Sequence, residues 1–217
     1  MQYDTVVFDL DGTLLNTLED LKDATNYALR TNGYPQRTLE EVRRFVGNGV
    51  RKLLERALPE DVSQESFAQV FADFKEYYGK HCEDTTCAYD GIMDMMAQLK
   101  EAGYRIAIVS NKLDSAVKEL SRTYFQDYVQ AAIGEKEGVR RKPAPDMVQT
   151  ALEELGSKAE AAVYIGDSEV DIQTAANAGL DCISVTWGFR EAAFLKEQGA
   201  KKMVDTPQQL FTLLQTL

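Results

Sequence analysis

The chain has 217 residues, 44% of them hydrophobic, which is enough for one large domain or for a core domain with a smaller partner. Its formal net charge of -11 and its isoelectric point of about 4.7 disfavour non-specific binding to nucleic acid or to an anionic membrane, although a small anionic substrate needs only a local cation or a metal. The sequence contains no apolar stretch long enough to span a bilayer.

Short apolar segments alternate with helical patterns along most of the chain. Near-continuous apolar runs are typical of strands in a parallel sheet that is covered on both faces, and they occupy residues 3–8, 105–109, 129–133, 161–165 and 182–185. Helical patterns occupy residues 92–102, 115–125, 145–155 and 170–178, and a last helix begins at Thr206. The sequence therefore predicts an α/β fold, a Rossmann-like doubly wound parallel sheet with catalytic groups at the carboxyl ends of its strands.

One segment interrupts this alternation, because every pattern from about residue 17 to residue 84 is helical. It predicts one helix over residues 18–29, a second that begins with the capping sequence 38–41, and a long third helix. The third helix has an apolar side that we expect to form the segment's own core: Phe67, Val70, Phe71, Phe74 and Tyr78. We therefore predict an inserted all-helical cap domain over residues 16–84 and a core domain over residues 1–15 and 85–217.

The strongest candidate for chemistry is the segment 8–14, at the end of the first predicted strand. Asp9 and Asp11, at positions i and i+2, start on the same side of the chain, and Gly12 lets the backbone turn and approach a ligand closely. Two adjacent carboxylates repel each other, so the pair favours a cation, for which Mg²⁺ with its oxygen ligands is suited. A solvated turn is the alternative, but the apolar strand before the pair favours a site.

With these residues the sequence resembles the haloacid dehalogenase superfamily, and the resemblance covers essentially the whole chain. It implies that Asp9 is the nucleophile that attacks phosphorus and forms an aspartyl-phosphate. It implies that Asp11 is the general acid and base, which protonates the leaving oxygen and later deprotonates the attacking water. It also implies that Thr13 binds the phosphoryl group and that the backbone carbonyl of Asp11 helps to hold a magnesium ion beside Asp9.

A second and a third family motif follow in the family's order. Ser110 and Asn111 come after the predicted strand 105–109, and the resemblance implies that the serine hydroxyl and nearby backbone amides hold the phosphoryl oxygens. Lys142 matches the third motif, and its ammonium would balance the charges of the phosphate and of Asp9. Taken singly, the first pair could be a turn and the lysine a solvated cation.

The fourth motif begins after the predicted strand 161–165. Asp167 resembles the family's metal-binding carboxylate, and Ser168 and Asp171 would support the metal site. Acidic residues at the start of a helix are the simpler alternative, because they interact favourably with the helix dipole. Phosphoryl transfer, however, requires cations and aligned donors on several sides of the phosphate, and four strand ends in the family's order can supply them.

Other residues resemble the phosphoglycolate-phosphatase-like branch of the superfamily. The loop 46–49 resembles a cap loop that faces the substrate, which implies substrate contacts from Gly47, Asn48 and a neighbouring arginine such as Arg43. For Arg43, Arg44 or Arg51 taken singly, a solvated helix face is about as strong an interpretation. Similarity to the branch extends to Lys112 and to Trp187, Gly188 and Phe189, whereas Asn16 departs from it, because the branch usually has Asp there.

The resemblance implies a magnesium-dependent phosphatase that hydrolyses a small phosphomonoester, with phosphoglycolate as the first candidate. A sugar-phosphate mutase, a pyrophosphatase or a nucleotidase on the same scaffold, or a non-catalytic sensor of a phosphorylated metabolite, are the alternatives. We expect the partner to be a small phosphorylated metabolite, not nucleic acid or a membrane. The sequence indicates no oligomeric state.

The cysteine and histidine content fits this interpretation. Cys82, Cys87 and Cys182 form no CxxC pair, so we expect reduced thiols. The single histidine, His81, excludes a multi-histidine zinc site. No cationic segment precedes the N-terminal apolar run, so we expect no signal peptide and a cytoplasmic protein.

Overall fold

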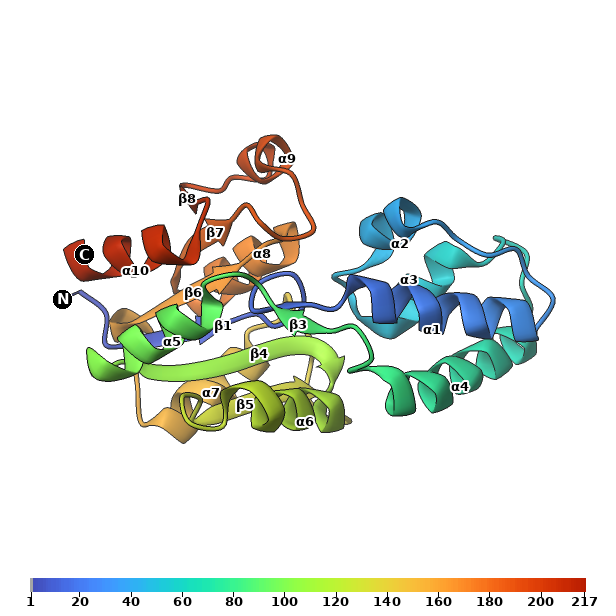
Figure 1. The fold of residues 1–217 in the computed structure, drawn as a ribbon, viewed down its shortest axis with the longest axis horizontal. Helices are drawn as coiled ribbons and strands as arrows, with labels where there is room; N and C mark the ends of the chain where they lie inside the picture. The colour runs from blue at the N-terminus through green and yellow to red at the C-terminus, as the bar shows by residue number, and fades with distance from the viewer. Residues whose placement is uncertain (1) are drawn as a thin grey trace. The chain divides into compact units, whose positions relative to one another are not determined.

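The computed structural model describes residues 2–217, and the chain divides into two compact units (Figure 1). The core unit holds the chain up to Leu15 and from Ala88 to Leu217, and the helical unit holds Asn16–Cys87. The chain passes between the units through two short strands that pair with each other, β2 (Leu15–Asn16) and β3 (Cys87–Ala88). The second boundary thus lies after Cys87, a little later than the predicted residue 84.

Within the described residues 2–15 and 88–217, a six-stranded parallel sheet has the order β5-β4-β1-β6-β7-β8. Its strands are β1 (Thr5–Phe8), β4 (Arg105–Leu113), β5 (Ala131–Glu135), β6 (Ala162–Gly166), β7 (Asp181–Val185) and β8 (Lys202–Val204). The chain starts at β1, adds β4 and β5 on one side, and then adds β6, β7 and β8 on the other. This is the doubly wound order, in which ligands bind beside the strand where the direction reverses, so the predicted Rossmann-like fold is confirmed.

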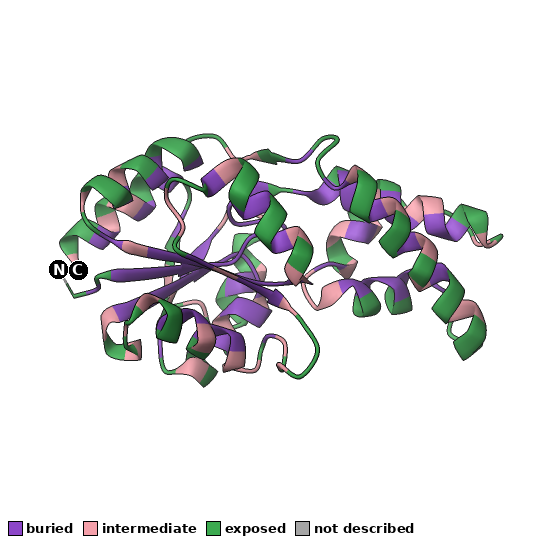
Figure 2. Ribbon diagram, turned by 90° about the horizontal axis from the view of Figure 1, so that it is seen from below, coloured by how far each residue is buried: buried purple, intermediate pink, exposed green. Residues whose placement is uncertain are grey.

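Helices cover both faces of the sheet. They are α5 (Ile92–Glu101), α6 (Asp114–Phe125), α7 (Asp146–Leu155), α8 (Glu169–Ala178), α9 (Ala192–Glu197) and α10 (Pro207–Thr216). Apolar side chains of α5, α6 and α10 pack with Val6 and Phe8 of β1, whereas those of α7 and α8 pack on the other face with Val7. Figure 2 shows the result, with strands that are buried along most of their length.

The sequence-based elements differ from the structure mainly at the edge of the sheet and at strand ends. β8 and α9 were not predicted, because each is too short for its apolar pattern to be recognised. β4 was expected to end at residue 109 but continues to Leu113, because its pairing with β5 resumes there after an irregularity in the ladder.

Residues 16–87, all of them described, form four helices where the sequence predicted three: α1 (Leu18–Thr31), α2 (Leu39–Phe45), α3 (Gly49–Ala57) and α4 (Gln64–His81). The predicted cap at Thr38 is present, because its hydroxyl accepts the Glu41 amide and the Glu41 carboxylate accepts the Thr38 amide. Along residues 2–217, no helix combines the length and the apolar character that crossing a membrane would need.

The apolar side of α4 is only partly the core that the sequence suggested. Val70, Phe74 and Tyr78, spaced four residues apart, are buried. Phe67 and Phe71 are only half-buried, and the guanidinium of Arg51 lies over both rings, 4.9 Å and 5.6 Å from their centroids. The expectation that all five residues are core was therefore wrong for these two phenylalanines, because their row of the helix faces a cation at the surface.

Candidate active site

Asp9 lies directly after β1 and is almost completely buried. Its Oδ1 accepts the backbone N–H of Leu10 at 2.7 Å and lies 2.8 Å from the Nζ of Lys142. Burial raises the pKa of Asp9 well above its usual value, and the negative charge of Asp171 adds to this, while Lys142 opposes it. The end of β1 therefore holds a carboxylate in a setting that penalises its charge unless a cation is close.

Lys142 is the cation that this carboxylate meets. It comes from the loop between β5 and α7, is 3% exposed, and places its Nζ 2.8 Å from an oxygen of Asp171 and 3.0 Å from the Tyr164 hydroxyl. Burial lowers the pKa of Lys142, but the charges of Asp171 and Asp9 outweigh it and leave the pKa well above the usual value. The buried lysine therefore stays charged and links Asp9, which follows β1, to Asp171 of α8.

Asn111 fixes the backbone of this lysine. Its Oδ1 accepts the amide of Lys142 at 2.8 Å, and its Nδ2 donates to the carbonyl of Lys142 at 3.1 Å. The side chain of the neighbouring Ser110 accepts the amide of Lys112 at 3.2 Å. The structure thus brings the second and third predicted motifs together, and the contact of Ser110 and Asn111 with a phosphate stays a prediction.

Asp167 follows β6 and is 2% exposed. Its Oδ2 accepts the backbone N–H of Phe189 at 2.6 Å, and the hydroxyl of Thr13 lies 3.4 Å from its Oδ1. Burial, followed by the charge of Asp171, raises the pKa of Asp167 to about 7. Thr13, predicted to bind phosphate, therefore contacts the candidate metal-binding carboxylate, and its phosphate contact stays a prediction.

Asp171, on the first turn of α8, is completely engaged by protein donors. One oxygen accepts from Lys142 and from the Tyr164 hydroxyl, at 2.8 Å and 3.2 Å. The other accepts the amide and the hydroxyl of Ser168, at 3.0 Å and 2.6 Å. Asp171 and Ser168 therefore act on the site by orienting the lysine and by capping α8.

Asp11 has a buried partner that the sequence analysis did not place in the site. The Nζ of Lys112 donates to a carboxylate oxygen of Asp11 at 2.7 Å, and the lysine side chain is only 3% exposed. The signals in the sequence were that Lys112 directly follows the second motif and that it is similar to the phosphoglycolate-phosphatase-like branch; neither indicated its pairing with Asp11. The two aspartates of the first motif thus each have their own lysine.

The charges of this group suit a divalent cation. Carboxylate oxygens of Asp9, Asp167 and Asp171 lie within 4.8 Å of one another. Four carboxylates, with Asp11 as the fourth, lie in this group together with the ammonium groups of Lys112 and Lys142. Because the oxygens of Asp171 already have donors, Asp9 and Asp167 are the residues that would hold an ion, and an all-oxygen set suits a hard cation such as Mg²⁺.

The predicted substrate residues of the 46–49 loop lie in the helical unit. The Nε of Arg43 is 3.6 Å from a carboxylate oxygen of Glu40, and the side-chain oxygen of Asn48 accepts from Arg56 at 2.9 Å. Gly47 has a φ of 115°, a backbone conformation that other residues rarely adopt. A contact of Arg43, Gly47 or Asn48 with a substrate stays a prediction.

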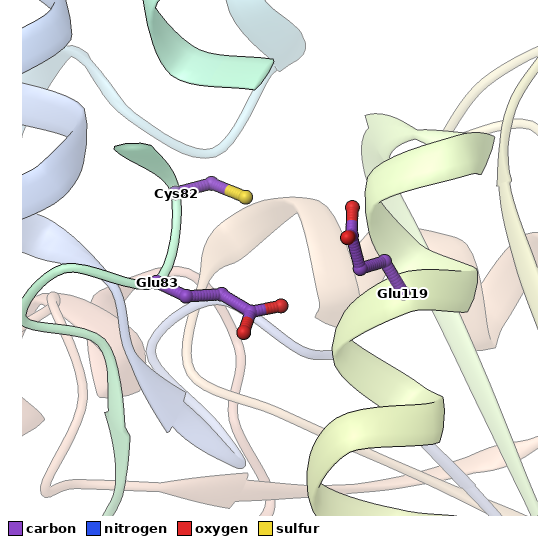
Figure 3. A group of neighbouring side chains, drawn as sticks. All are labelled: Cys82, Glu83 and Glu119. Carbon is purple, nitrogen blue, oxygen red and sulfur yellow. The ribbon is translucent and has the colours of Figure 1, made fainter. Parts of the chain in front are cut away.

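A second group of potential ligand side chains, drawn in Figure 3, has members in both units. Cys82 and Glu83 follow α4 in the helical unit, whereas Glu119 lies on α6 of the core unit. These residues form no cluster within either unit, and we assign no site to them.

Comparison with known proteins agrees with the fold and the motifs. The family model described as haloacid dehalogenase-like hydrolase matches residues 6–185. A phosphoglycolate phosphatase of Rhodobacter capsulatus is 36% identical over 190 residues, covering 86% of this chain and 85% of that protein. One of Aliivibrio fischeri is 30% identical over 216 residues, covering 96% and 95%. The chain therefore belongs to the haloacid dehalogenase-like hydrolase family.

Solved structures agree with this assignment. The crystal structure of a proposed phosphoglycolate phosphatase from Lactobacillus delbrueckii subsp. bulgaricus superposes with a TM-score of 0.94 at 40% identity, over 97% of this chain and 98% of that one. A predicted phosphatase from Clostridium acetobutylicum superposes with a TM-score of 0.89 at 26% identity over the whole of both chains. Within the family, the chain thus groups with the phosphoglycolate-phosphatase-like hydrolases, as its motifs predicted.

Proposed function

We propose that the protein is a magnesium-dependent phosphatase that hydrolyses a small phosphomonoester, with phosphoglycolate as the first candidate, through an aspartyl-phosphate on Asp9. One observation carries this proposal. Lys142 joins Asp9 to Asp171 at 2.8 Å each, and carboxylate oxygens of Asp9 and Asp167 lie within 4.8 Å of each other. This arrangement supports the proposal, because phosphoryl transfer requires a nucleophile, a fixed cation and a metal-binding carboxylate at one place.

The chemistry takes two steps. In the first, a carboxylate oxygen of Asp9 attacks phosphorus, the bond between phosphorus and the ester oxygen breaks, and Asp11 gives its proton to that oxygen. In the second, Asp11 removes a proton from water, the water oxygen attacks phosphorus, and the bond to Asp9 breaks. The products are the alcohol and inorganic phosphate, and both aspartates return to their starting state.

Fixed charges assist both steps. Lys142 places its ammonium beside Asp9, where it stabilises the negative charge of the phosphoryl oxygens during transfer. A Mg²⁺ ion held by Asp9 and Asp167 supplies further positive charge to the phosphate when bound. Asn111 contributes by holding the backbone of Lys142.

The choice of phosphoglycolate depends on the relatives and on the helical unit. The groups of the core unit address a phosphoryl group that every candidate substrate shares, so discrimination must come from other residues. The two curated relatives named above are phosphoglycolate phosphatases, and this chain matches them over most of their length. An arginine of the segment 43–51 would bind the carboxylate of such a substrate by a charge-assisted hydrogen bond.

A phosphate-release screen tests this function. The purified protein is supplied with Mg²⁺ and with phosphoglycolate, ethyl phosphate, sugar phosphates, pyrophosphate, nucleotides and an aryl phosphate. We expect phosphate release from phosphoglycolate and from the aryl phosphate, loss of both in EDTA, and recovery when Mg²⁺ is restored. Phosphoryl transfer to a sugar hydroxyl, with no phosphate released in the absence of an acceptor sugar, would identify a mutase. A folded protein that hydrolyses none of these esters would contradict the proposal.

A further inference from the structure

A short segment after β7 contacts both parts of the acidic site in the core unit. The indole N–H of Trp187 donates to the backbone carbonyl of Thr13 at 2.9 Å. The backbone N–H of Phe189 donates to Oδ2 of Asp167 at 2.6 Å. The segment Trp187–Phe189, here called the strap, thus connects the loop that carries the first motif with the carboxylate that follows β6.

Gly188, between these two residues, packs too closely for a side chain. A Cβ at this position would lie 2.3 Å from the carbonyl oxygen of Gly12 and 2.5 Å from Oδ2 of Asp167. A Cβ on Gly12 would in turn lie 2.4 Å from the same carboxylate oxygen and 2.9 Å from the Phe189 ring. Real Cβ atoms do not make such contacts, so two glycines are needed for the strap, the loop and the carboxylate to touch.

We propose that the strap is the positioning element of the cation site, and that it fixes Asp167 so that its carboxylate faces Asp9. This inference rests on the proposed function, because it assumes that Asp9 and Asp167 hold a divalent cation. A carboxylate that already accepts a fixed backbone N–H has less freedom to lose when the ion binds, and groups that orient a metal ligand in this way commonly change metal affinity 10- to 100-fold. Nothing in the chemistry of phosphoryl transfer itself requires these three residues.

The glycine is the most direct point to test. Gly188→Ala forces Gly12 or Asp167 to move, so we expect the affinity for Mg²⁺ alone, measured by calorimetry, to fall about 10-fold or more. Gly79→Ala is the matched control, because Gly79 on α4 has open space where a Cβ would be and should leave the affinity unchanged. Thermal unfolding in EDTA shows whether each variant is folded, and a merely structural role of Gly188 would lower the unfolding temperature without changing the affinity of the folded protein.

A second variant keeps the inference open to test if Gly188→Ala does not fold. Trp187→Phe removes the indole N–H and keeps an aromatic ring, and the loss of one hydrogen bond predicts Mg²⁺ binding about 3- to 10-fold weaker. If the folded variants bind Mg²⁺ as tightly as the parent, the strap does not position the site.

The parent protein offers an independent readout, because Trp187 is its single tryptophan. We expect its fluorescence to change as Mg²⁺ is added, with the midpoint that calorimetry gives, and no response despite measurable binding would contradict the inference. The proposed function fails separately, if the parent neither binds Mg²⁺ nor needs it to hydrolyse an aryl phosphate. If the parent binds Mg²⁺ and the variants bind it with the same affinity, the result contradicts the inference about the strap and leaves the proposed function intact.

Discussion

The candidate site residues of the two units differ in how their side chains are held. In the core unit, Lys142, Asp171 and Asp167 are buried and each makes several short contacts, so little in the group can move independently. In the helical unit, Arg44 and Arg51 are exposed, and Arg51 lies over aromatic rings at the surface. We therefore expect the core unit to fix the reaction and the helical unit to offer adaptable groups that decide which ester is used.

The largest effect is expected when a buried residue of the core unit is substituted. The Asp9→Asn variant cannot form the aspartyl-phosphate, so we expect kcat to fall about 10⁴-fold or more with every substrate. Asp90→Asn, an exposed aspartate of the same unit, is the matched control and should keep full activity. Comparable rates for Asp9→Asn and the parent would remove covalent catalysis from the account.

The affinity for the cation should depend on pH, with a change smaller than the loss of kcat expected for Asp9→Asn. The pKa of Asp167 is raised to about 7 by burial and by Asp171, so the cation-free protein takes up a proton here as the pH falls through about 7. Because the ion needs the ionised carboxylate, its affinity should fall about 10-fold for each pH unit below that value, which calorimetry at several pH values measures. A cation affinity that does not change between pH 5 and pH 8 would contradict this expectation.

The same raised pKa has a consequence for stability. The unfolded chain has an Asp167 with an ordinary pKa near 3.8, so between this value and about 7 the folded protein binds more protons than the unfolded one. The contribution of Asp167 to stability therefore declines as the pH rises through this window, and Mg²⁺ should restore it. Unfolding temperatures with Mg²⁺ and with EDTA at pH 5 and pH 8 measure the difference.

Single arginine substitutions test whether the helical unit selects the substrate. Arg43 lies near Glu40 and Arg51 over two phenylalanines, whereas Arg44 is exposed and, among residues 2–217, takes part in no ion pair. We expect Arg44→Ala to lower kcat/KM for phosphoglycolate about 10-fold, or roughly 1.4 kcal/mol, and to leave aryl phosphate turnover nearly unchanged.

Arg43→Ala and Arg51→Ala serve as comparisons in the same segment and should cost less. If all three variants hydrolyse phosphoglycolate like the parent, its carboxylate is bound elsewhere or another ester is the substrate. Ethyl phosphate, which lacks the carboxylate, separates these outcomes: a true phosphoglycolate enzyme should prefer phosphoglycolate to it.

The sequence could predict that Asp9 and Asp167 would lie close together, because each follows an apolar strand. Asp9 and Asp167 directly follow β1 and β6, which are neighbours in the sheet, so the doubly wound order alone brings them together. Lys142 follows no such rule, since it comes from a loop before α7, and only the family resemblance pointed to it. Its place depends on the side chain of Asn111, a contact that no spacing in the sequence indicates.

Other features could not be predicted because they depend on close approach in space. Gly188 and Gly12 are far apart in the sequence, and nothing in either segment shows that a Cβ would collide with Asp167. The same holds for Lys112, whose pairing with Asp11 joins the ends of two different strands. In the helical unit, the sequence did not indicate that one row of aromatic residues on α4 would face a cation instead of the core.

The central claim, that Asp9 of the core unit carries the phosphoryl group, can be tested by trapping the intermediate. In Asp11→Asn, an aryl phosphate should still phosphorylate Asp9, because its leaving group needs no proton, whereas hydrolysis of the acyl phosphate should be slow without the base. Mass spectrometry of rapidly quenched protein should then find a covalent phosphate on the peptide that contains Asp9, and none in Asp9→Asn. A phosphate on another residue, or continued turnover without any phosphorylated protein, would contradict the account.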